Sequence, residues 1–264
     1  MHKISIVMPC HNEGSDIYRN LHETVKTMDE LMQYNIDYEI ILVDDGSTDN
    51  TLDQARLVKS SKINIVTYSP NRGKGYAIKL GFTYASGDLV TFVDSDLEIH
   101  PKQLFRFMSY IYEYNAGMVI GSKRHPDSKI TYPFKRRFLS VFYHLFVNFL
   151  FGLNVHDTQS GFKLLRYECA QKILPKVVVK RFAFDLEMLV VAKKYGYRIK
   201  EAPIEVRFNF DRRGVGFHSV WSILVDTLGV AYRKYFLKFY DEPKAVLPQK
   251  APSITYGKDH LGAK

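Results

Sequence analysis

The chain has few cysteines and no segment that resembles an export signal. Its 264 residues include two cysteines, Cys10 and Cys169, which lie far apart and belong to no Cys-x-x-Cys or Cys/His pattern. A disulfide framework and a zinc site are therefore not expected, and a reducing compartment is the default. The opening MHKISIVMPCHNEG turns polar before an apolar signal region could develop, so the simplest placement is the cytoplasm.

Long uninterrupted apolar runs are also absent. The most apolar segment, residues 138–155, is interrupted at regular intervals by Ser140, His144 and Asn148. As a helix it would be about 27 Å long, which is marginal for the roughly 30 Å core of a bilayer. Residues 219–240 combine an apolar face with basic residues, a pattern typical of a helix in a membrane interface. Packing of both segments into an ordinary protein core remains the alternative.

Positive charge is scarce in the first hundred residues and abundant afterwards. The formal net charge is +9, but residues 1–100 hold 9 Lys and Arg against 15 Asp and Glu, a net charge of −6. Residues 101–264 hold 28 against 13, a net charge of +15. We interpret the basic half as a surface for an anionic partner such as nucleic acid, a phospholipid surface or a phosphorylated substrate.

Short apolar runs alternate with segments of helical spacing through residues 1–97. The runs KISIVMP, YEIILVDDG, INIVTYS and LVTFVDSD predict buried strands, and residues 14–34 between the first two predict an amphipathic helix. This alternation predicts the α/β class, with a mainly parallel sheet flanked by helices. In such sheets ligands bind at the carboxyl ends of the strands, where the aspartates of VDD and VDSD lie.

The VDSD run ends in carboxylates that suit a hard metal ion. Asp94 and Asp96 are one residue apart, and Glu98 follows two positions later. Two carboxylates so close repel each other unless a cation lies beside them, and Mg²⁺ typically takes one or two carboxylates plus phosphate oxygens. The pattern predicts a Mg²⁺ or Mn²⁺ site, and a polar strand end or helix cap is the alternative.

Two further segments offer groups for a ligand. In DDGSTD, Asp44 or Asp45 can accept hydrogen bonds from a nucleobase or ribose, or can simply shape a turn and helix cap. NRGKG lacks the phosphate-loop pattern, but Gly73 and Gly75 permit close backbone approach and Lys74 can pair with an anion.

In the second half, HDTQSGFKLL places Asp157 and Gln159 before a glycine turn, where Asp157 is equally well explained as a cap. RFAFDLEML sets Asp185 and Glu187 among apolar residues, which requires partners for both carboxylates.

As an ordered set these motifs resemble the family 2 glycosyltransferases of the GT-A fold. The set comprises IVMPCHNE, ILVDDGSTDNT, NRGKGYAIKLG, GDLVTFVDSDLEIHP, VIGSKR and DTQSGFKLL, and the resemblance covers roughly residues 3–235. It is strongest to the polyprenyl-phosphate sugar transferases. DTQSGFKLL followed by RFAFDLEMLVVAKKYGYRIKEAPIEV resembles most the dolichyl-phosphate glucose branch, with the mannose branch next.

The resemblance implies roles for individual residues. The substrate-binding residues that it implies are Pro9, Asn12, Glu13, Asp44, Asp45, Lys74, Asp94, Ser95, Arg124, Gln159 and Arg212. Mg²⁺ or Mn²⁺ is held by Asp94 and Asp96, with Glu98 at a third-ligand position. Asp96, Arg137 and Asp157 are the implied catalytic residues. The family's closing R-x-x-G-x-S-K-like loop is here DRRGVGFHS, which lacks that lysine, so phosphate contact from this loop would have to come from Arg212, Arg213 or His218.

The implied reaction is inverting transfer of a hexose from a nucleotide sugar to a polyprenyl or dolichyl phosphate. UDP-glucose is the favoured donor and GDP-mannose the next. We expect a peripheral, monotopic enzyme on the cytoplasmic face of a membrane. The alternatives are a family 2 transferase with a polysaccharide or other hydroxyl acceptor and a non-catalytic nucleotide-sugar binder. No nucleic-acid motif is recognised, so no nucleic-acid partner is expected.

For the domain organisation we expect one GT-A domain over residues 1–240. It would comprise a nucleotide-sugar half (1–118), an acceptor half (119–218) and an amphipathic helix (219–240). Residues 241–264 lack periodicity and are predicted to be a flexible tail.

Overall fold

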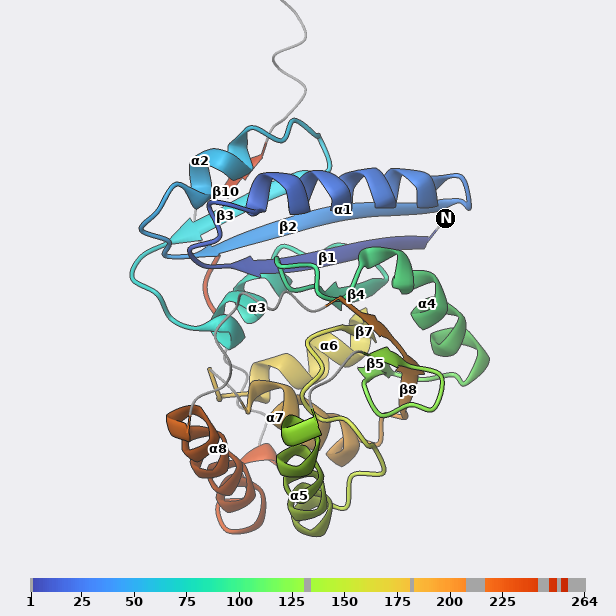
Figure 1. Ribbon diagram of the computed structural model, residues 1–264, viewed down its shortest axis with the longest axis vertical. Coiled ribbons are helices and arrows are strands. Elements are labelled where there is room, and N and C mark those ends of the chain that lie inside the picture. Colours follow the sequence, from blue (N-terminus) through green and yellow to red (C-terminus); the bar gives the residue numbers. More distant parts are fainter. Residues whose placement is uncertain are drawn as a thin grey trace, which may run out of the picture. The chain divides into compact units, whose positions relative to one another are not determined.

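The computed structural model describes residues 2–130, 134–180, 183–207, 217–241, 247–250 and 253–255. Side chains are described for all of these except 134–142, 217–220 and 253–255. The chain forms two compact units, residues 1–97 with 247–264 and residues 98–246. Both are drawn in Figure 1.

The first unit is a sheet of strand order β10-β3-β2-β1-β4 with helices packed against it. β1 to β4 are parallel and β10 pairs antiparallel with β3. Its elements are β1 (His2–Cys10), α1 (Ile17–Met32), β2 (Ile36–Asp45), α2 (Thr51–Arg56), β3 (Ile63–Tyr68), α3 (Lys74–Phe82), β4 (Leu89–Phe92) and β10 (Ser253–Thr255).

The helices of this unit pack as their apolar spacing predicts. α1 lies along β2 and buries Ile17, Leu21 and Met28, while Val25 and Met32 at the edge of that face stay half-buried (Figure 1). α3 packs against β1 and β2. The central strands are buried on both faces, which is why they appear in the sequence as continuous apolar runs.

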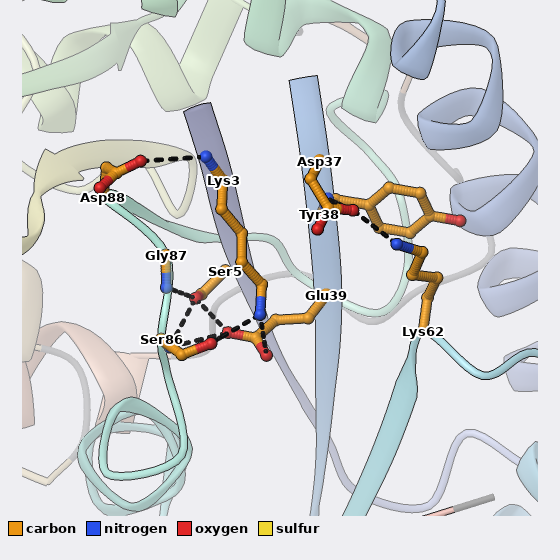
Figure 2. A network of polar contacts seen from close by, with 9 residues as sticks. All are labelled: Lys3, Ser5, Asp37, Tyr38, Glu39, Lys62, Ser86, Gly87 and Asp88. Atoms are coloured by element: carbon orange, nitrogen blue, oxygen red, sulfur yellow. Dashed lines mark hydrogen bonds and ion pairs between the residues drawn. The ribbon is translucent and has the colours of Figure 1, made fainter. Parts of the chain in front are cut away.

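A network of polar contacts joins the amino ends of the strands, as Figure 2 shows. The carboxylate of Glu39 on β2 accepts hydrogen bonds from the Ser5 hydroxyl at 2.6 Å, the Ser86 N–H at 2.7 Å and the Lys3 ammonium at 3.0 Å. Because these groups come from β1, β2 and the loop before β4, the network fixes the register of three strands at the end opposite their carboxyl termini.

The second unit carries a smaller sheet of order β7-β5-β8, with β5 parallel to β8 and antiparallel to β7. A separate parallel pair is formed by β6 and β9. Its strands are β5 (Met118–Ser122), β6 (Lys129–Ile130), β7 (Lys163–Arg166), β8 (Ile199–Pro203) and β9 (Glu205–Val206). Its α-helices are α4 (Leu104–Glu113), α5 (Phe134–Phe151), α6 (Tyr167–Ile173), α7 (Phe184–Lys194) and α8 (Phe217–Tyr235). Short 3-10 helices span η1 (Pro101–Gln103), η2 (Leu174–Lys176) and η3 (Phe239–Asp241).

Two carboxylates on α7 have the partners that their apolar surroundings require. Asp185 pairs with the buried Lys163 ammonium at 2.6 Å. Glu187 is fully buried, accepts the Val178 and Val179 N–H groups at 2.7 Å each, and pairs with Arg233 of α8. The Tyr240 hydroxyl also donates to Glu187, so this carboxylate ties α7 to α8 and η3.

The observed architecture confirms the predicted α/β class with a mainly parallel sheet and flanking helices. Within the predicted flexible tail, residues 253–255 form β10 beside β3. Backbone pairing with an edge strand needs no side-chain periodicity, so the sequence carried no signal for it. Residues 256–264 lie outside the described part of the chain.

The structure divides after Leu97, and the single domain over 1–240 stays a prediction.

Candidate active site

A cavity of about 410 Å³ opens at the carboxyl ends of β1, β2 and β4 in the first unit. This volume falls within the usual range for small-molecule sites, roughly 300–1,000 Å³. Seven of the predicted residues line the cavity: Pro9, Glu13, Asp45, Lys74, Asp94, Ser95 and Asp96. The structure therefore brings together most of the predicted donor residues of this unit.

The two aspartates of VDSD are held on a tight turn after β4. The Leu97 N–H donates to the Asp94 carbonyl at 3.1 Å, and Leu97 has a φ of 51°, which reverses the chain. Ser95 between them is buried, and its carbonyl accepts a hydrogen bond from the Asn20 side chain of α1 at 2.8 Å. The turn thus fixes the backbone from which Asp94 and Asp96 reach the cavity.

Lys74 supplies a positive charge beside this pair. It is the first residue of α3, and its ammonium lies 2.5 Å from the Asp94 carboxylate. The two side chains are 36% and 42% exposed, so the ion pair remains open to a ligand.

The Asp45 carboxylate is the centre around which residues 71–73 fold. It accepts hydrogen bonds from the Tyr68 hydroxyl at 2.7 Å, the Arg72 N–H at 2.7 Å and the Gly73 N–H at 2.9 Å. The Asn71 amide adds a further bond at 3.1 Å. Burial, followed by the hydrogen bond to Asp45, raises the pKa of Tyr68, so its hydroxyl stays protonated as a donor. Asp45 therefore positions the loop that leads into Lys74.

Asp44 and Asn12 stabilise the neighbouring turn instead of lining the cavity. The Asp44 carboxylate is buried and accepts the Ser47 N–H at 3.1 Å and the Thr67 hydroxyl at 2.9 Å. Asn12 accepts the Thr48 N–H at 2.9 Å, and its own N–H donates to Ser47 at 2.9 Å. A direct contact of either residue with base or ribose stays a prediction.

Three lining residues escaped the sequence reasoning: Cys10, His11 and Asn71. Cys10 and His11 follow Pro9 directly, so proximity to predicted residues was the available signal. Burial, then the charge of Asp44, raises the pKa of the Cys10 thiol well above its usual range. Cys10 is buried and its thiol donates to the Val43 carbonyl at 3.7 Å, so it forms a wall of the cavity.

The donor set of the cavity suits a divalent cation that a substrate completes. Within the described ranges no three His, Cys, Asp or Glu side chains converge on a point that could hold a metal. Asp94 and Asp96 both line the cavity, and Mg²⁺ or Mn²⁺ bound by two carboxylates takes its other ligands from water and phosphate. Lys74 already places a cation against Asp94, which shows that this position attracts positive charge.

Glu98, the predicted third ligand, belongs to the second unit, where its carbonyl accepts the Arg207 N–H at 2.8 Å. Asp157 caps the turn of DTQSG there. Its carboxylate accepts the Lys123 N–H at 3.0 Å and the Gln159 N–H at 3.1 Å. Arg124 follows Lys123 directly, so Arg124, Asp157 and Gln159 are gathered around one loop contact.

Two predicted basic residues fall outside what the structure describes. Arg137 lies on α5, but its side chain is among those not described, and Arg212 lies between the described ranges. The proposed loop DRRGVGFHS is likewise outside them through Gly216.

An apolar stripe is exposed along α8 and continues to Phe236, the residue directly after the helix. Its members recur at three or four residues and are 51% to 77% exposed: Trp221, Val225, Leu228, Tyr232 and Phe236. The opposite side buries Thr227 and Val230. On α5, Phe149 is 88% exposed. Among the helices that the structure describes, α5 and α8 included, none is both long enough and apolar enough to cross a bilayer.

Curated relatives share the sequence over most of the chain. Dolichyl-phosphate beta-glucosyltransferase of Dictyostelium discoideum is 34% identical over 216 residues, which cover 76% of this chain and 65% of that protein. The proteins of the same name from Saccharomyces cerevisiae and Mus musculus are 31% and 30% identical, with 76% of this chain and 66% of each relative covered. The chain thus spans just under two thirds of the length of these relatives.

A solved structure shares the fold. Glucosyl-3-phosphoglycerate synthase from Mycobacterium tuberculosis, in complex with Mn²⁺, UDP-glucose and phosphoglyceric acid, matches with a TM-score of 0.64 and 20% identity. The match covers 92% of this chain and 81% of that chain. This likeness shows a fold of the GT-A type.

A model of the family described as "Glycosyl transferase family 2" matches residues 5–174. That range includes the whole carboxylate cavity and the DTQSG turn. The protein belongs to glycosyl transferase family 2.

Proposed function

We propose that this protein transfers a hexose, glucose from UDP-glucose in the first place and mannose from GDP-mannose in the second, to a polyprenyl or dolichyl phosphate. The observation that carries the proposal is the cavity at the carboxyl edge of the first unit, where Asp94, Asp96 and Lys74 meet. The relatives' name supports the glucosyl group and the lipid acceptor.

The first unit supplies the donor site. Asp94 and Asp96 would hold Mg²⁺ or Mn²⁺, which supplies electrostatic stabilisation of the charge on the departing nucleoside diphosphate. Lys74 and the start of α3 add positive potential at the same edge of the cavity. Pro9 and Glu13 line the end of the cavity formed by β1, where a nucleoside would be held.

The second unit supplies groups for the acceptor. A phosphate monoester is already ionised near neutral pH, so its oxygen can attack the anomeric carbon without a general base. Asp157, whose carboxylate accepts two backbone N–H groups, then orients the loop that carries Arg124 and Gln159. Attack opposite the leaving diphosphate inverts the anomeric centre.

The lipid acceptor fits a protein that lies on a membrane. The exposed stripe of α8 offers apolar area for the lipid interface, and residues 123–137 are rich in Lys and Arg. We propose that the second unit docks on the cytoplasmic face of an anionic membrane, peripherally.

A transfer assay tests the proposal. Labelled UDP-glucose, GDP-mannose and UDP-N-acetylglucosamine are offered separately with a polyprenyl phosphate and Mn²⁺, and label is counted in the organic phase. We expect label from UDP-glucose, none in EDTA, and a loss of at least about 100-fold in Asp96→Asn, because metal stabilisation contributes several kcal/mol and each 1.36 kcal/mol is tenfold in rate.

The variant Asp53→Asn makes the same change of charge on α2, outside the cavity lining, and serves as the matched control. Transfer of label to a polysaccharide acceptor in the absence of lipid, with loss of that transfer in Asp157→Asn, would contradict the proposal that the acceptor is a lipid phosphate. Nucleotide binding without turnover on any acceptor would overturn catalysis itself.

A further inference from the structure

The charges around the cavity are unbalanced. Asp45, Asp94, Asp96 and Glu13 line it, and among the described lining residues Lys74 is the one with a permanent positive charge. A diphosphate entering this cavity meets repulsion from the aspartates, and a divalent cation entering it meets repulsion from the lysine. Either ligand alone therefore disturbs the ion pair between Lys74 and Asp94.

The Lys74 side chain is placed where it can change partner without movement of the backbone. The loop before it is fixed by Asp45, which holds the Arg72 and Gly73 N–H groups, and the Gly73 carbonyl accepts the Tyr76 N–H at 3.0 Å. Beyond this fixed Cα the lysine stem is flexible, and its ammonium is partly exposed. Rotation of the stem alone is enough to carry the ammonium away from Asp94.

We propose that Lys74 occupies the cation position at Asp94 until the donor arrives, and that its transfer to the diphosphate couples nucleotide binding to divalent-cation binding. The inference rests on the proposed function, since it assumes a diphosphate donor and a divalent cation in this cavity. Whichever ligand binds first breaks the pair between Lys74 and Asp94, and the second then binds without that cost. Each ligand therefore raises the affinity for the other, as linkage requires.

Calorimetric titration of the full chain tests this coupling. The dissociation constant of Mn²⁺ is measured with and without UDP, and that of UDP with and without Mn²⁺. In Lys74→Gln we expect Mn²⁺ alone to bind about five- to tenfold more tightly than in the wild type, the lower range of allosteric couplings. UDP alone should bind more weakly, and the ratio of Mn²⁺ affinities with and without UDP should fall.

Two variants make the outcome specific. Lys79→Gln removes the same charge from α3 outside the cavity lining and should leave both constants within about twofold of the wild type. Lys74→Arg keeps the charge and should restore weak Mn²⁺ binding in the absence of UDP. Thermal unfolding of each variant is followed in parallel to verify the fold.

Unchanged or weaker Mn²⁺ binding by folded Lys74→Gln would overturn the exchange of partners while leaving the donor site intact. An equal gain in Mn²⁺ affinity in Lys79→Gln would show that net charge alone causes the effect, and it would also overturn the exchange of partners. A wild-type chain that binds neither Mn²⁺ nor UDP would overturn the proposed donor site together with this inference.

Discussion

Asp44 and Asp45 are adjacent in the chain, yet their carboxylates hold different loops. Asp44 closes its own turn through Ser47 and Thr67, whereas Asp45 gathers the backbone of residues 72 and 73. Successive residues of a strand point to opposite faces, so this difference follows from the position of the pair at the end of β2.

Replacement of Asp45 tests its positioning role. In Asp45→Asn one oxygen becomes an NH₂ group that cannot accept the loop N–H groups, so the residues before Lys74 lose their anchor. We expect UDP affinity to fall about tenfold or more, since hydrogen bonds to charged groups contribute roughly 1.5–3 kcal/mol. Asp53→Asn, on the exposed side of α2, makes the same change of charge and should leave UDP affinity unchanged in the same titration.

Glu39 makes the stability of the first unit depend on pH. Burial is the largest influence and would raise the pKa of Glu39, but hydrogen bonds from Ser5, Ser86 and Lys3 together lower it below its usual 4.5. A lowered folded-state pKa stabilises the fold above the unfolded-state pKa, and this contribution disappears as pH falls through the folded-state value.

Denaturant unfolding of Glu39→Gln at several pH values checks this. Near pH 7 the variant should be less stable by about 1–2 kcal/mol, the cost of a weakened, partly buried acceptor. The difference from the wild type should shrink as pH falls below 4.5 and through the lowered folded-state pKa of Glu39. A difference that stays constant from pH 7 to pH 3 would contradict the assignment.

The place of Asp94, Asp96 and Lys74 in the cavity could be predicted, because charged residues at strand ends and helix starts of a parallel sheet lie at its carboxyl edge. A turn was one of the two predicted roles of Asp44. The role of Asn12 in that turn could not be predicted, because hydrogen bonds within a loop depend on which chain segments meet. Cys10 and His11 carried no distinctive pattern, and they line the cavity through the path of β1 alone.

Among the elements, α3 makes an unusually close approach to the sheet at one position. A Cβ added to Gly81 would lie 2.4 Å from Val7 Cγ1 and 2.9 Å from Val43 Cγ2, closer than real side chains pack. Gly81 therefore allows α3 to contact β1 and β2 directly, and this contact sets the place of Lys74 at the start of the helix.

Gly81→Ala should accordingly destabilise the protein by about 1–3 kcal/mol, the usual cost of overpacking. Gly229→Ala on α8 is the matched control, because its nearest neighbour would be the flexible Arg233 side chain at 3.4 Å. That variant should be neutral or slightly stabilised, since alanine is the better helix former. Equal losses in both variants, measured by thermal unfolding, would sink the packing explanation.

Elements with strong periodicity, such as α1 and the parallel strands, followed from the sequence. β10 did not, because three residues held by backbone hydrogen bonds leave no pattern in the side chains. The division of the chain after Leu97 lies close to the change of net charge at residue 100, whereas the predicted halves met at residue 118.

For the whole molecule, the uneven charge predicts how it meets a membrane. The second part of the chain carries +15 and the exposed stripe of α8, so attraction to anionic lipid should add to apolar insertion. Binding to vesicles of phosphatidylserine and phosphatidylcholine should weaken severalfold as NaCl rises from about 0.1 to 0.5 M, because salt screens exposed charges.

Replacement of Trp221 and Phe236 by serine should lower vesicle binding on the order of tenfold or more, through the loss of apolar area. Leu57→Ser, at a residue of the first unit that is 56% exposed, is the control and should bind as the wild type does. Vesicle sedimentation measures both. Vesicle binding that changes neither with salt nor on replacement of Trp221 and Phe236 would contradict the prediction that α8 contacts the membrane.

The first unit is built from two stretches of chain, and the second unit is the stretch that lies between them in the sequence. The returning stretch is held by β10 on β3. A pulling force applied at His2 and Thr255 therefore runs through β1, β2, β3 and β10 while that pairing persists, and no tension reaches residues 98–241. Once β10 is stripped away, the same force extends along the whole chain. Three residues of antiparallel pairing thus determine when the second unit begins to bear mechanical load.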